Sequence, residues 1–324
     1  MGTAERSSEP ADGLRAAGPV GFVGCGRMGG PMARRLLSAG VEVRAYDVDE
    51  RALRAVADAG AHAAASPRDA ARDVPVVITM LPDPPVVERA ARGPEGLLAG
   101  LGDGALWLEM SSSRPATTQA LADAAAERGA ALLDAPVSGG VAGAEAGTLT
   151  IMLGGPAALV ERARPLLAEL GESLVHVGDH AGEGDAAKTI NNMLSATNLA
   201  AAAEALAMGM RAGLDPERLV ECVNGGTGAS HAMTNKVGGQ VLTGKFASRF
   251  TLGQYLKDLG IARGLADDHR VPTPVNGAAH AVWTAHAARG AADADHTRLV
   301  ALLLADAGID HDWSASAPDE EEAA

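Results

Sequence analysis

A glycine-rich turn near the start of the chain constrains the fold more than any other feature. Residues 20–24 form an apolar run that predicts a short strand, and residues 32–39 predict a helix. The sequence between them contains a G-x-G-x-x-G motif in the strand–turn–helix context that gives this motif its meaning. Glycines permit a tight turn and the close approach of a pyrophosphate, whose charge the helix N-terminus favours. The sequence therefore predicts a dinucleotide site whose cofactor-binding residues are Gly24, Gly26, Arg27, Met28 and Gly29.

An acidic residue ends the next predicted strand. Residues 41–47 end in Asp47, at about the 20-residue spacing expected for the carboxylate that binds the ribose of a dinucleotide. A carboxylate there accepts hydrogen bonds from the 2'-hydroxyl and repels a 2'-phosphate. It thus favours NAD, with NADP as the alternative cofactor. The competing interpretation is that Asp47 caps the helix beginning near Glu50, a role that Asp49 would fill equally well.

Further strands are predicted at residues 75–81 and 105–110, separated by helical stretches. Such alternation predicts a parallel, doubly wound sheet, in which ligands bind beyond the carboxyl ends of the strands. Leu81, Pro82 and Ser112 stand at those ends and are candidate cofactor-binding residues. The alternative for Ser112 and its neighbouring serines is to cap the helix that follows.

A second glycine-rich bend follows residues 132–137. Ser138, Gly139 and Gly140 combine a hydroxyl with backbone amides that little steric bulk covers. That combination suits a carboxylate, so the three residues are candidates for substrate binding. An ordinary turn would have the same composition.

Residues 186–210 form the longest nearly uncharged segment, and Lys188 and Glu204 are its charged residues. Its Ala, Leu and Met content predicts a helix buried on most faces, and its scattered Asn and Ser residues argue against a membrane span. Lys188, Asn192 and Ser195 share one face of that helix. Only four of the 27 Lys and Arg residues are lysines. A buried amine can lose its proton and a guanidinium cannot, so Lys188 is a candidate proton-transfer group, the alternative being a snorkelling or ion-paired lysine.

Composition excludes several classes of protein. The formal net charge of -14 and the aromatic share of 2% argue against nucleic-acid and anionic-membrane partners. The two cysteines are far apart, and we expect no metal site. Residues 1–18 lack the apolar core of a signal peptide, which favours a cytoplasmic protein.

The chain is long enough for two domains. We expect a leader without ordered structure at residues 1–18, a dinucleotide-binding domain at residues 19–183, a helical substrate and oligomerisation domain at residues 184–310, and an acidic tail at residues 311–324. His231 lies in a glycine-rich break within the helical domain. It either faces the substrate or is a surface or capping histidine.

Four blocks of sequence, at residues 24–32, 134–155, 184–192 and 257–259, occur in the order found in the beta-hydroxyacid dehydrogenase family. The chain resembles this family from about residue 20 to residue 304. The resemblance implies that Lys188 is the catalytic lysine and that Asn192 holds the substrate and the lysine in place. It also implies that Ser138, Gly139 and Gly140 bind the substrate carboxylate. Lys257 is similar to the lysine that closes the site near the nicotinamide, and Ser112 stands where the family often has Thr.

The resemblance implies an α/β fold, with an N-terminal Rossmann-type doubly wound sheet, an all-α C-terminal domain and a long helix joining them. It implies an NAD-dependent oxidoreductase, a homodimer or homotetramer, that interconverts a small 3-hydroxy acid such as 3-hydroxyisobutyrate and its semialdehyde, with Lys188 as general acid and base. One alternative is a reductase of tartronate, succinic or sulfonated semialdehydes. A second anionic group on the substrate would call for Arg or Lys near the carboxylate loop, and residues 134–147 contain neither. The other alternative is a catalytically silent NAD(P)-binding module.

Overall fold

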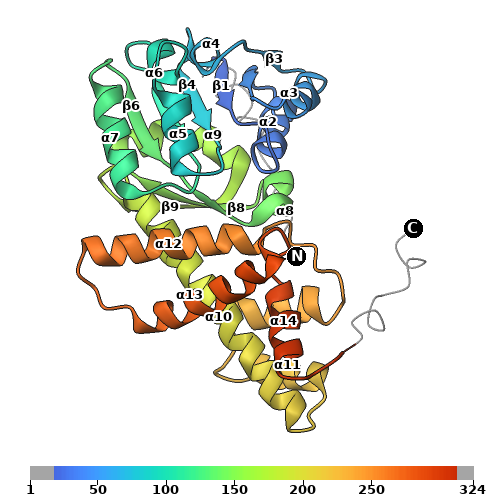
Figure 1. The fold of residues 1–324 in the computed structure, drawn as a ribbon. Helices are drawn as coiled ribbons and strands as arrows, with labels where there is room; N and C mark the ends of the chain where they lie inside the picture. The colour runs from blue at the N-terminus through green and yellow to red at the C-terminus, as the bar shows by residue number, and fades with distance from the viewer. Residues whose placement is uncertain (1–17, 312–324) are drawn as a thin grey trace, which may run out of the picture. The chain divides into compact units, whose positions relative to one another are not determined.

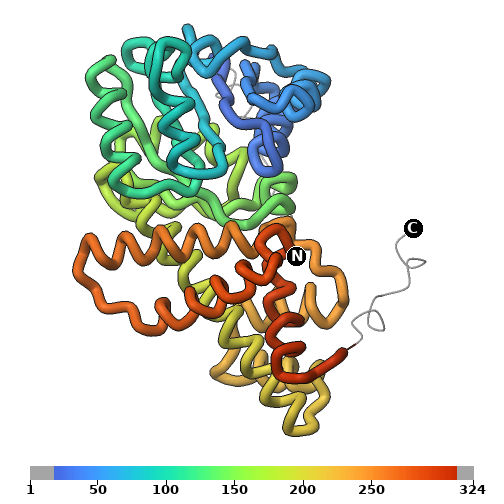
Figure 2. Tube along the Cα trace, viewed as in Figure 1, coloured from blue at the N-terminus to red at the C-terminus, as the bar shows by residue number. Residues whose placement is uncertain are grey.

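The structure, a computed structural model, describes residues 18–311 as two compact units, with the division between Lys188 and Thr189 (Figures 1 and 2). The division falls inside helix α10 (Glu183–Arg211), close to the predicted domain boundary at residue 183, which stays a prediction. Apart from Gly18 and His311, the predicted leader and acidic tail lie outside the described residues.

The first unit is built on a nine-stranded sheet. Its strands are β1 (Val20–Val23), β2 (Val43–Tyr46), β3 (His62–Ala63), β4 (Val76–Thr79), β5 (Leu106–Glu109), β6 (Ala131–Asp134), β7 (Val137–Ser138), β8 (Leu149–Gly154) and β9 (Gly171–Gly178). Their order is β3-β2-β1-β4-β5-β6-β8-β7, with β9 paired to β8. Neighbours from β3 to β6 are parallel, whereas β8 runs antiparallel to β6 and β7. The predicted doubly wound sheet is confirmed, and the antiparallel strands are an addition to it.

Helices cover both faces of this sheet, as the upper part of Figure 1 shows. They are α2 (Gly29–Ser38), α3 (Glu50–Ala57), α4 (Pro67–Ala71), α5 (Pro84–Ala91), α6 (Leu97–Gly100), α7 (Pro115–Ala126), α8 (Gly140–Ala146) and α9 (Ala157–Leu170). Along β4 and β5, Ile78 and Leu108 pack with α2, α3 and α9, while Val77 and Trp107 pack with α4 to α7. Both faces of β4 and of β5 are therefore apolar, which explains the continuous apolar runs in these two parts of the sequence.

The second unit is helical, as predicted. Besides most of α10 it contains α11 (Pro216–Asn224), the π-helix η1 (Ala232–Val241), α12 (Leu252–Asp268), α13 (Pro274–His286), the π-helix η2 (Ala287–Ala291) and α14 (Arg298–Asp306). The side chain of Asp215 caps α11, and Thr251 opens α12 with a capping box. Trp283 is fully buried in a core that also contains Leu206 and Leu259.

Helix α10 is buried or half-buried on most faces, as expected, but one face along its length is exposed. Ile190, Leu194 and Met208 are 49%, 51% and 70% exposed. Their spacing puts them on one face of the helix, opposite Leu199 and Leu206 in the core. The apolar composition of α10 therefore reflects two faces, one in the core of the second unit and one exposed. Among the helices of residues 18–311, none combines the length and the hydropathy that a membrane span requires.

Candidate functional site

The glycine turn between β1 and α2 needs its glycines for different reasons. Gly24 has φ +100°, and a Cβ on Gly29 would collide with the carbonyl oxygen of Gly24. Gly26, by contrast, has open space where a Cβ would stand. The backbone conformation requires a glycine at position 24, and close packing requires one at position 29. Gly26 instead leaves room for the close approach of a ligand's phosphates. Beside them, Arg27 is exposed and Met28 half-buried. The turn fits a dinucleotide.

Asp47 lies at the end of β2 and is joined to this turn. Its Oδ2 accepts a hydrogen bond from the backbone N–H of Cys25 at 2.6 Å, and its Oδ1 accepts one from the N–H of Asp49 at 2.8 Å. Asp49, not Asp47, caps α3, because its side chain accepts from the N–H of Arg51. The competing capping role for Asp47 is therefore filled by Asp49. The ribose-binding role of Asp47 stays a prediction.

The loops after β4 and β5 meet beside the glycine turn. The backbone N–H of Leu81 donates to Ser111 Oγ at 2.9 Å, and the Leu81 side chain lies against Gly24. Pro82 is exposed and Ser112 is half-buried. Leu81 therefore lies next to the predicted dinucleotide turn, and its hydrogen bond to Ser111 holds it there. Ser111 was not among the predicted site residues. The cofactor contacts of Pro82 and Ser112 stay predictions.

The bend at Ser138, Gly139 and Gly140 leads from β7 into α8. Ser138 is half-buried and pairs with Thr150 of β8, which fixes the start of the bend. Gly139 and Gly140 have φ values of +135° and +65°, a region that side chains disfavour, and both are exposed. The bend therefore leaves the backbone of Gly139 and Gly140 uncovered next to the half-buried Ser138, as a carboxylate-binding loop requires.

The first turn of α10 is held to the sheet by a buried carboxylate. Asp134, at the end of β6, accepts hydrogen bonds from the N–H groups of Gly182 at 2.8 Å and Asp185 at 2.9 Å. A negative charge is favourable at a helix N-terminus, where these groups would otherwise be unsatisfied. Lys188 is half-buried and follows Gly184 by one turn, so the position of its backbone depends on this anchor.

A glycine in this turn makes the close contact possible. A Cβ on Gly184 would stand 2.6 Å from the carbonyl oxygen of Met152 and 2.8 Å from Asp134 Oδ2. We therefore expect Gly184→Ala to lower the melting temperature by several degrees, because overpacking of this kind costs about 1–3 kcal/mol. The matched control is Gly264→Ala in α12, where a Cβ meets open space and alanine favours the helix. Thermal unfolding should give opposite signs for the two variants. Equal shifts would contradict the proposed contact.

Three buried carboxyl groups lie together where β5, β6 and α10 meet. Burial raises the pKa of Glu109 to about 7 and that of Asp134 to about 6, and it raises the pKa of Asp185 well above its ordinary value. The charge of Asp134 raises the pKa of the other two further. Glu109 Oε1 accepts from Thr79 and Ser111, whereas Oε2 has no hydrogen-bond partner among the described residues. The cluster therefore retains protons near neutral pH.

This cluster makes stability depend on pH. The raised pKa of Glu109 means that the folded protein keeps a proton that the unfolded chain loses above pH about 4.5. The burial of Glu109 therefore does not destabilise the folded state below pH about 4.5. Its cost to the free energy of unfolding grows up to pH about 7 and is constant at higher pH. We expect the stability of Glu109→Gln relative to the wild type to rise between pH 5 and 7, by at most about 1.4 kcal/mol per pH unit. Denaturant unfolding at each pH measures this difference, and a difference that does not change with pH would refute the explanation.

In the second unit, Asn192 and Lys257 meet through a third residue. Asn192 Nδ2 donates to Asp258 Oδ2 at 2.6 Å, and Lys257 Nζ lies 3.0 Å from Asp258 Oδ1. Asn192 and Asp258 are buried, and Lys257 is half-buried. The amide orientation of Asn192 follows from this contact, because a carboxylate accepts hydrogen bonds and cannot donate them. Asp258 was missed as a site residue, although it directly follows Lys257.

His231 is exposed at the start of η1. Its pKa is lowered by partial burial and by the positive charge of Lys236. Its predicted contact with a substrate stays a prediction. Lys236 itself is buried, and sequence reasoning assigned it no role. The sequence feature that could have indicated a role for Lys236 is that it is one of only four lysines among the 27 Lys and Arg residues of the chain.

Two family models match the chain, one over its first half and one over its second half. Residues 19–178 match the NAD binding domain of 6-phosphogluconate dehydrogenase. Residues 182–303 match the NAD-binding domain of NADP-dependent 3-hydroxyisobutyrate dehydrogenase. The first match contains the glycine turn and Asp47, and the second contains Lys188, Asn192 and Lys257.

The chain is similar to several dehydrogenases over most of its length. It is 40% identical to 2-(hydroxymethyl)glutarate dehydrogenase of Eubacterium barkeri, covering 87% of this chain and 93% of that protein. It is also 40% identical to 3-hydroxyisobutyrate dehydrogenase of Pseudomonas aeruginosa, covering 86% and 95%. A solved structure of Mycobacterium tuberculosis 3-hydroxyisobutyrate dehydrogenase with L-serine superposes with a TM-score of 0.82 at 32% identity, covering 88% of this chain and 99% of that one. The chain is thus an NAD(P)-dependent oxidoreductase and belongs to the beta-hydroxyacid dehydrogenase family.

Proposed function

We propose that the protein oxidises a small 3-hydroxy acid to its semialdehyde and prefers NAD to NADP. The observation that carries the proposal is the similarity to two dehydrogenases named for 3-hydroxyisobutyrate and 2-(hydroxymethyl)glutarate. Both acids have a hydroxymethyl group on the carbon next to a carboxylate. The hydroxymethyl carbon is then the carbon that is oxidised, and the neighbouring carboxylate is the group that binding must recognise.

The catalytic roles in this proposal belong to a few side chains. The glycine turn and Asp47 would hold NAD, and its nicotinamide would supply the acceptor for a hydride from the hydroxyl-bearing carbon. Neutral Lys188 takes the hydroxyl proton, which is general base catalysis by a positioned amine. Ser138 Oγ and the backbone N–H of Gly139 bind the substrate carboxylate. Asn192, whose Nδ2 donates to Asp258 and whose Oδ1 accepts from Asn191 Nδ2 at 3.1 Å, helps to hold the substrate and Lys188 in place.

The reverse reaction is the second candidate, because the same groups serve both directions. In a semialdehyde reductase, Lys188 would start protonated and donate its proton to the carbonyl oxygen. A silent dinucleotide-binding module would have no need of Lys188 and Asn192, one turn apart on α10. Their presence together favours an enzyme.

We propose that the protein works in the cytoplasm as a homodimer or homotetramer. Ile190 and Leu194, exposed one turn apart on α10, support self-association, since neighbouring exposed apolar side chains are typical of interaction surfaces. Light scattering coupled to size-exclusion chromatography tests this. A monomer at micromolar concentration would overturn it.

The function is tested by measuring NADH and NADPH formation with a panel of hydroxy acids. The panel contains 3-hydroxyisobutyrate, 2-(hydroxymethyl)glutarate, serine, glycerate, 4-hydroxybutyrate and threonate. We expect turnover with at least one acid whose hydroxymethyl group is bonded to the carboxylate-bearing carbon, and a higher kcat/KM with NAD. Turnover with none of them would refute the proposed function, and a higher kcat/KM with NADP would refute the cofactor preference.

A further inference from the structure

Asp185, in the first turn of α10, joins two other segments of the first unit. Its side chain is 1% exposed. Oδ1 accepts a hydrogen bond from the backbone N–H of Ser113 at 3.1 Å, and Oδ2 shares one with Thr118 Oγ1 at 2.6 Å. Ser113 lies in the loop between β5 and α7, and Thr118 lies in the first turn of α7. The two partners are 72 and 67 positions away in the sequence, so these bonds fix the start of α10 against distant parts of the unit.

The loop that Asp185 holds is also held at its other end. The backbone N–H of Ser111 donates to Glu109 Oε1 at 3.0 Å, and Ser111 Oγ accepts from the N–H of Leu81 at 2.9 Å. Leu81 in turn lies against the glycine turn. Ser112, a candidate cofactor contact, therefore stands between two residues whose backbone N–H groups bind buried carboxyl groups. Because both neighbours are fixed, the position of Ser112 is fixed as well.

Asp185 also belongs to the helical turn that carries the proposed proton-transfer group. Lys188 follows Asp185 by three residues, so the two residues lie on the same face of α10, about 4.5 Å apart along its axis. The segment that leads into α10 packs closely against the start of α7, because a Cβ on Gly182 would stand 2.9 Å from the carbonyl oxygen of Pro115. The backbone from which Lys188 extends is therefore placed by contacts with the loop after β5 and with α7.

We propose that Asp185 is a positioning residue that sets the distance between Lys188 and the loop containing Ser112. It acts through its bonds to Ser113 and Thr118, not by contact with the substrate or the cofactor. The inference rests on the proposed function and deepens it. Lys188 must reach the hydroxyl oxygen on the same carbon that gives up the hydride, and a displacement of about 1 Å in such a geometry costs up to about 100-fold in rate.

The chemistry of the side chain indicates which substitution preserves these bonds. Burial raises the pKa of Asp185 well above its ordinary value, which favours the uncharged carboxyl. An uncharged carboxyl has an acceptor oxygen for the N–H of Ser113 and an O–H donor for Thr118 Oγ1. The amide of asparagine has the same shape and offers an acceptor and a donor at the same two positions. Asp185→Asn should therefore keep both bonds, and Asp185→Ala should remove them.

The test measures kcat, KM and the affinity for NADH in the wild type, Asp185→Ala and Asp185→Asn. The substrate is the hydroxy acid of the panel that the wild type oxidises fastest, and thermal unfolding establishes that each variant is folded at the assay temperature. We expect Asp185→Ala to lower kcat by about 10- to 100-fold, with KM and NADH affinity within about threefold of the wild type, because misplacement affects the reaction more than binding. Asp185→Asn should keep kcat within about threefold of the wild type.

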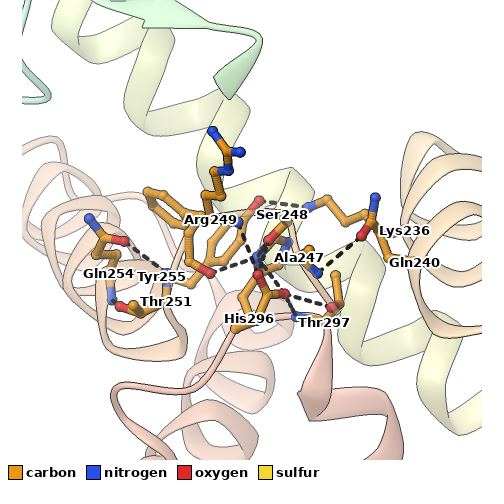
Figure 3. A network of polar contacts seen from close by, with 12 residues as sticks. Lys236, Gln240, Ala247, Ser248, Arg249, Thr251, Gln254, Tyr255, His296 and Thr297 are labelled. Atoms are coloured by element: carbon orange, nitrogen blue, oxygen red, sulfur yellow. Dashed lines mark hydrogen bonds and ion pairs between the residues drawn. The ribbon is translucent and has the colours of Figure 1, made fainter. Parts of the chain in front are cut away.

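The bond to Thr118 is tested separately and has a matched control. Thr118→Val removes the hydroxyl and should lower kcat by about 10-fold, whereas Thr118→Ser keeps the hydroxyl and should retain the wild-type rate. The control is Thr297, in the polar network of Figure 3, whose Oγ1 donates to Asp295 Oδ1, also at 2.6 Å. Thr118 and Thr297 are both fully buried. Thr297→Val thus removes a bond of the same kind in the second unit, and it should lower the melting temperature and leave kcat within about twofold of the wild type.

The outcomes separate this inference from the proposed function. A wild-type kcat in Asp185→Ala overturns the inference, and so does an equal loss in Asp185→Asn and Asp185→Ala, which would assign the effect to charge. A loss of kcat that Thr297→Val shows equally also overturns it, because stability alone would then explain the result. In each case the proposed function stands. If Asp185→Ala does not fold, the Thr118 variants decide, and equal kcat in Thr118→Val and Thr118→Ser refutes the inference. A wild type that oxidises no hydroxy acid with either cofactor overturns the proposed function, and this inference with it.

Discussion

Replacing Lys188 by methionine is expected to lower kcat by about 10^2- to 10^4-fold, the usual contribution of a positioned proton-transfer group. Methionine keeps the length and apolar character of the side chain but cannot exchange a proton. Lys188 is anchored through the first turn of α10 by its backbone, so the substitution leaves the contacts of Asp134 with Gly182 and Asp185 unchanged. The measurement is the single-turnover rate of NADH formation at saturating substrate.

The controls for Lys188→Met distinguish lost chemistry from lost structure. Affinity for NADH, followed by fluorescence, should remain within about threefold of the wild type, because the glycine turn and Asp47 lie elsewhere in the first unit. Lys188→Arg should be as inactive as the methionine variant, since a guanidinium does not deprotonate. A methionine variant with wild-type turnover would remove Lys188 from the mechanism.

Replacing Asp47 by asparagine is expected to reduce the preference for NAD over NADP by about 10- to 100-fold, because a charge-assisted hydrogen bond to the ribose is lost and repulsion of a 2'-phosphate is removed. The measurement is the ratio of kcat/KM with the two cofactors. Asp49→Asn is the matched control. It removes one negative charge two residues away and keeps the cap of α3, because asparagine caps as well as aspartate.

An unchanged cofactor ratio in Asp47→Asn would exclude Asp47 from ribose recognition. Loss of activity with both cofactors would indicate instead that its bond to the N–H of Cys25 shapes the glycine turn. Measuring both cofactors in both variants separates these results, since only recognition of the 2'-position changes the ratio.

Features of the fold that depend on neighbouring residues could be predicted. The apolar run of β1, the glycines that follow it and the helix after them form one local unit, and the structure has them in that order. Asp215 and Pro216 begin α11 and are a local signal of this kind, because an N-cap acts on backbone groups within three residues. The alternation of strands and helices indicated the parallel sheet for the same reason, since each element carries its own periodicity.

Contacts between distant residues could not be predicted from periodicity or motifs. Asp258 and Asn192 are 66 positions apart, and Lys236 and Ser195 are 41 apart. Nothing local to either member indicates its partner. The exposed face of α10 was missed for a related reason, because an apolar composition does not distinguish a side chain in the core from one on an uncovered surface.

The amino-acid sequence by itself determined the dinucleotide turn, the family and the lysine on the long helix, because these depend on residue type and short spacing. The tertiary structure alone decided that Asp134 anchors that helix, that Asp258 orients Asn192, and that Lys236 stands beside Ser195 and Tyr255. The physical reason is that hydrogen bonds and charges act over a few ångströms of space, whatever the separation along the chain. Only folding brings such partners within that range.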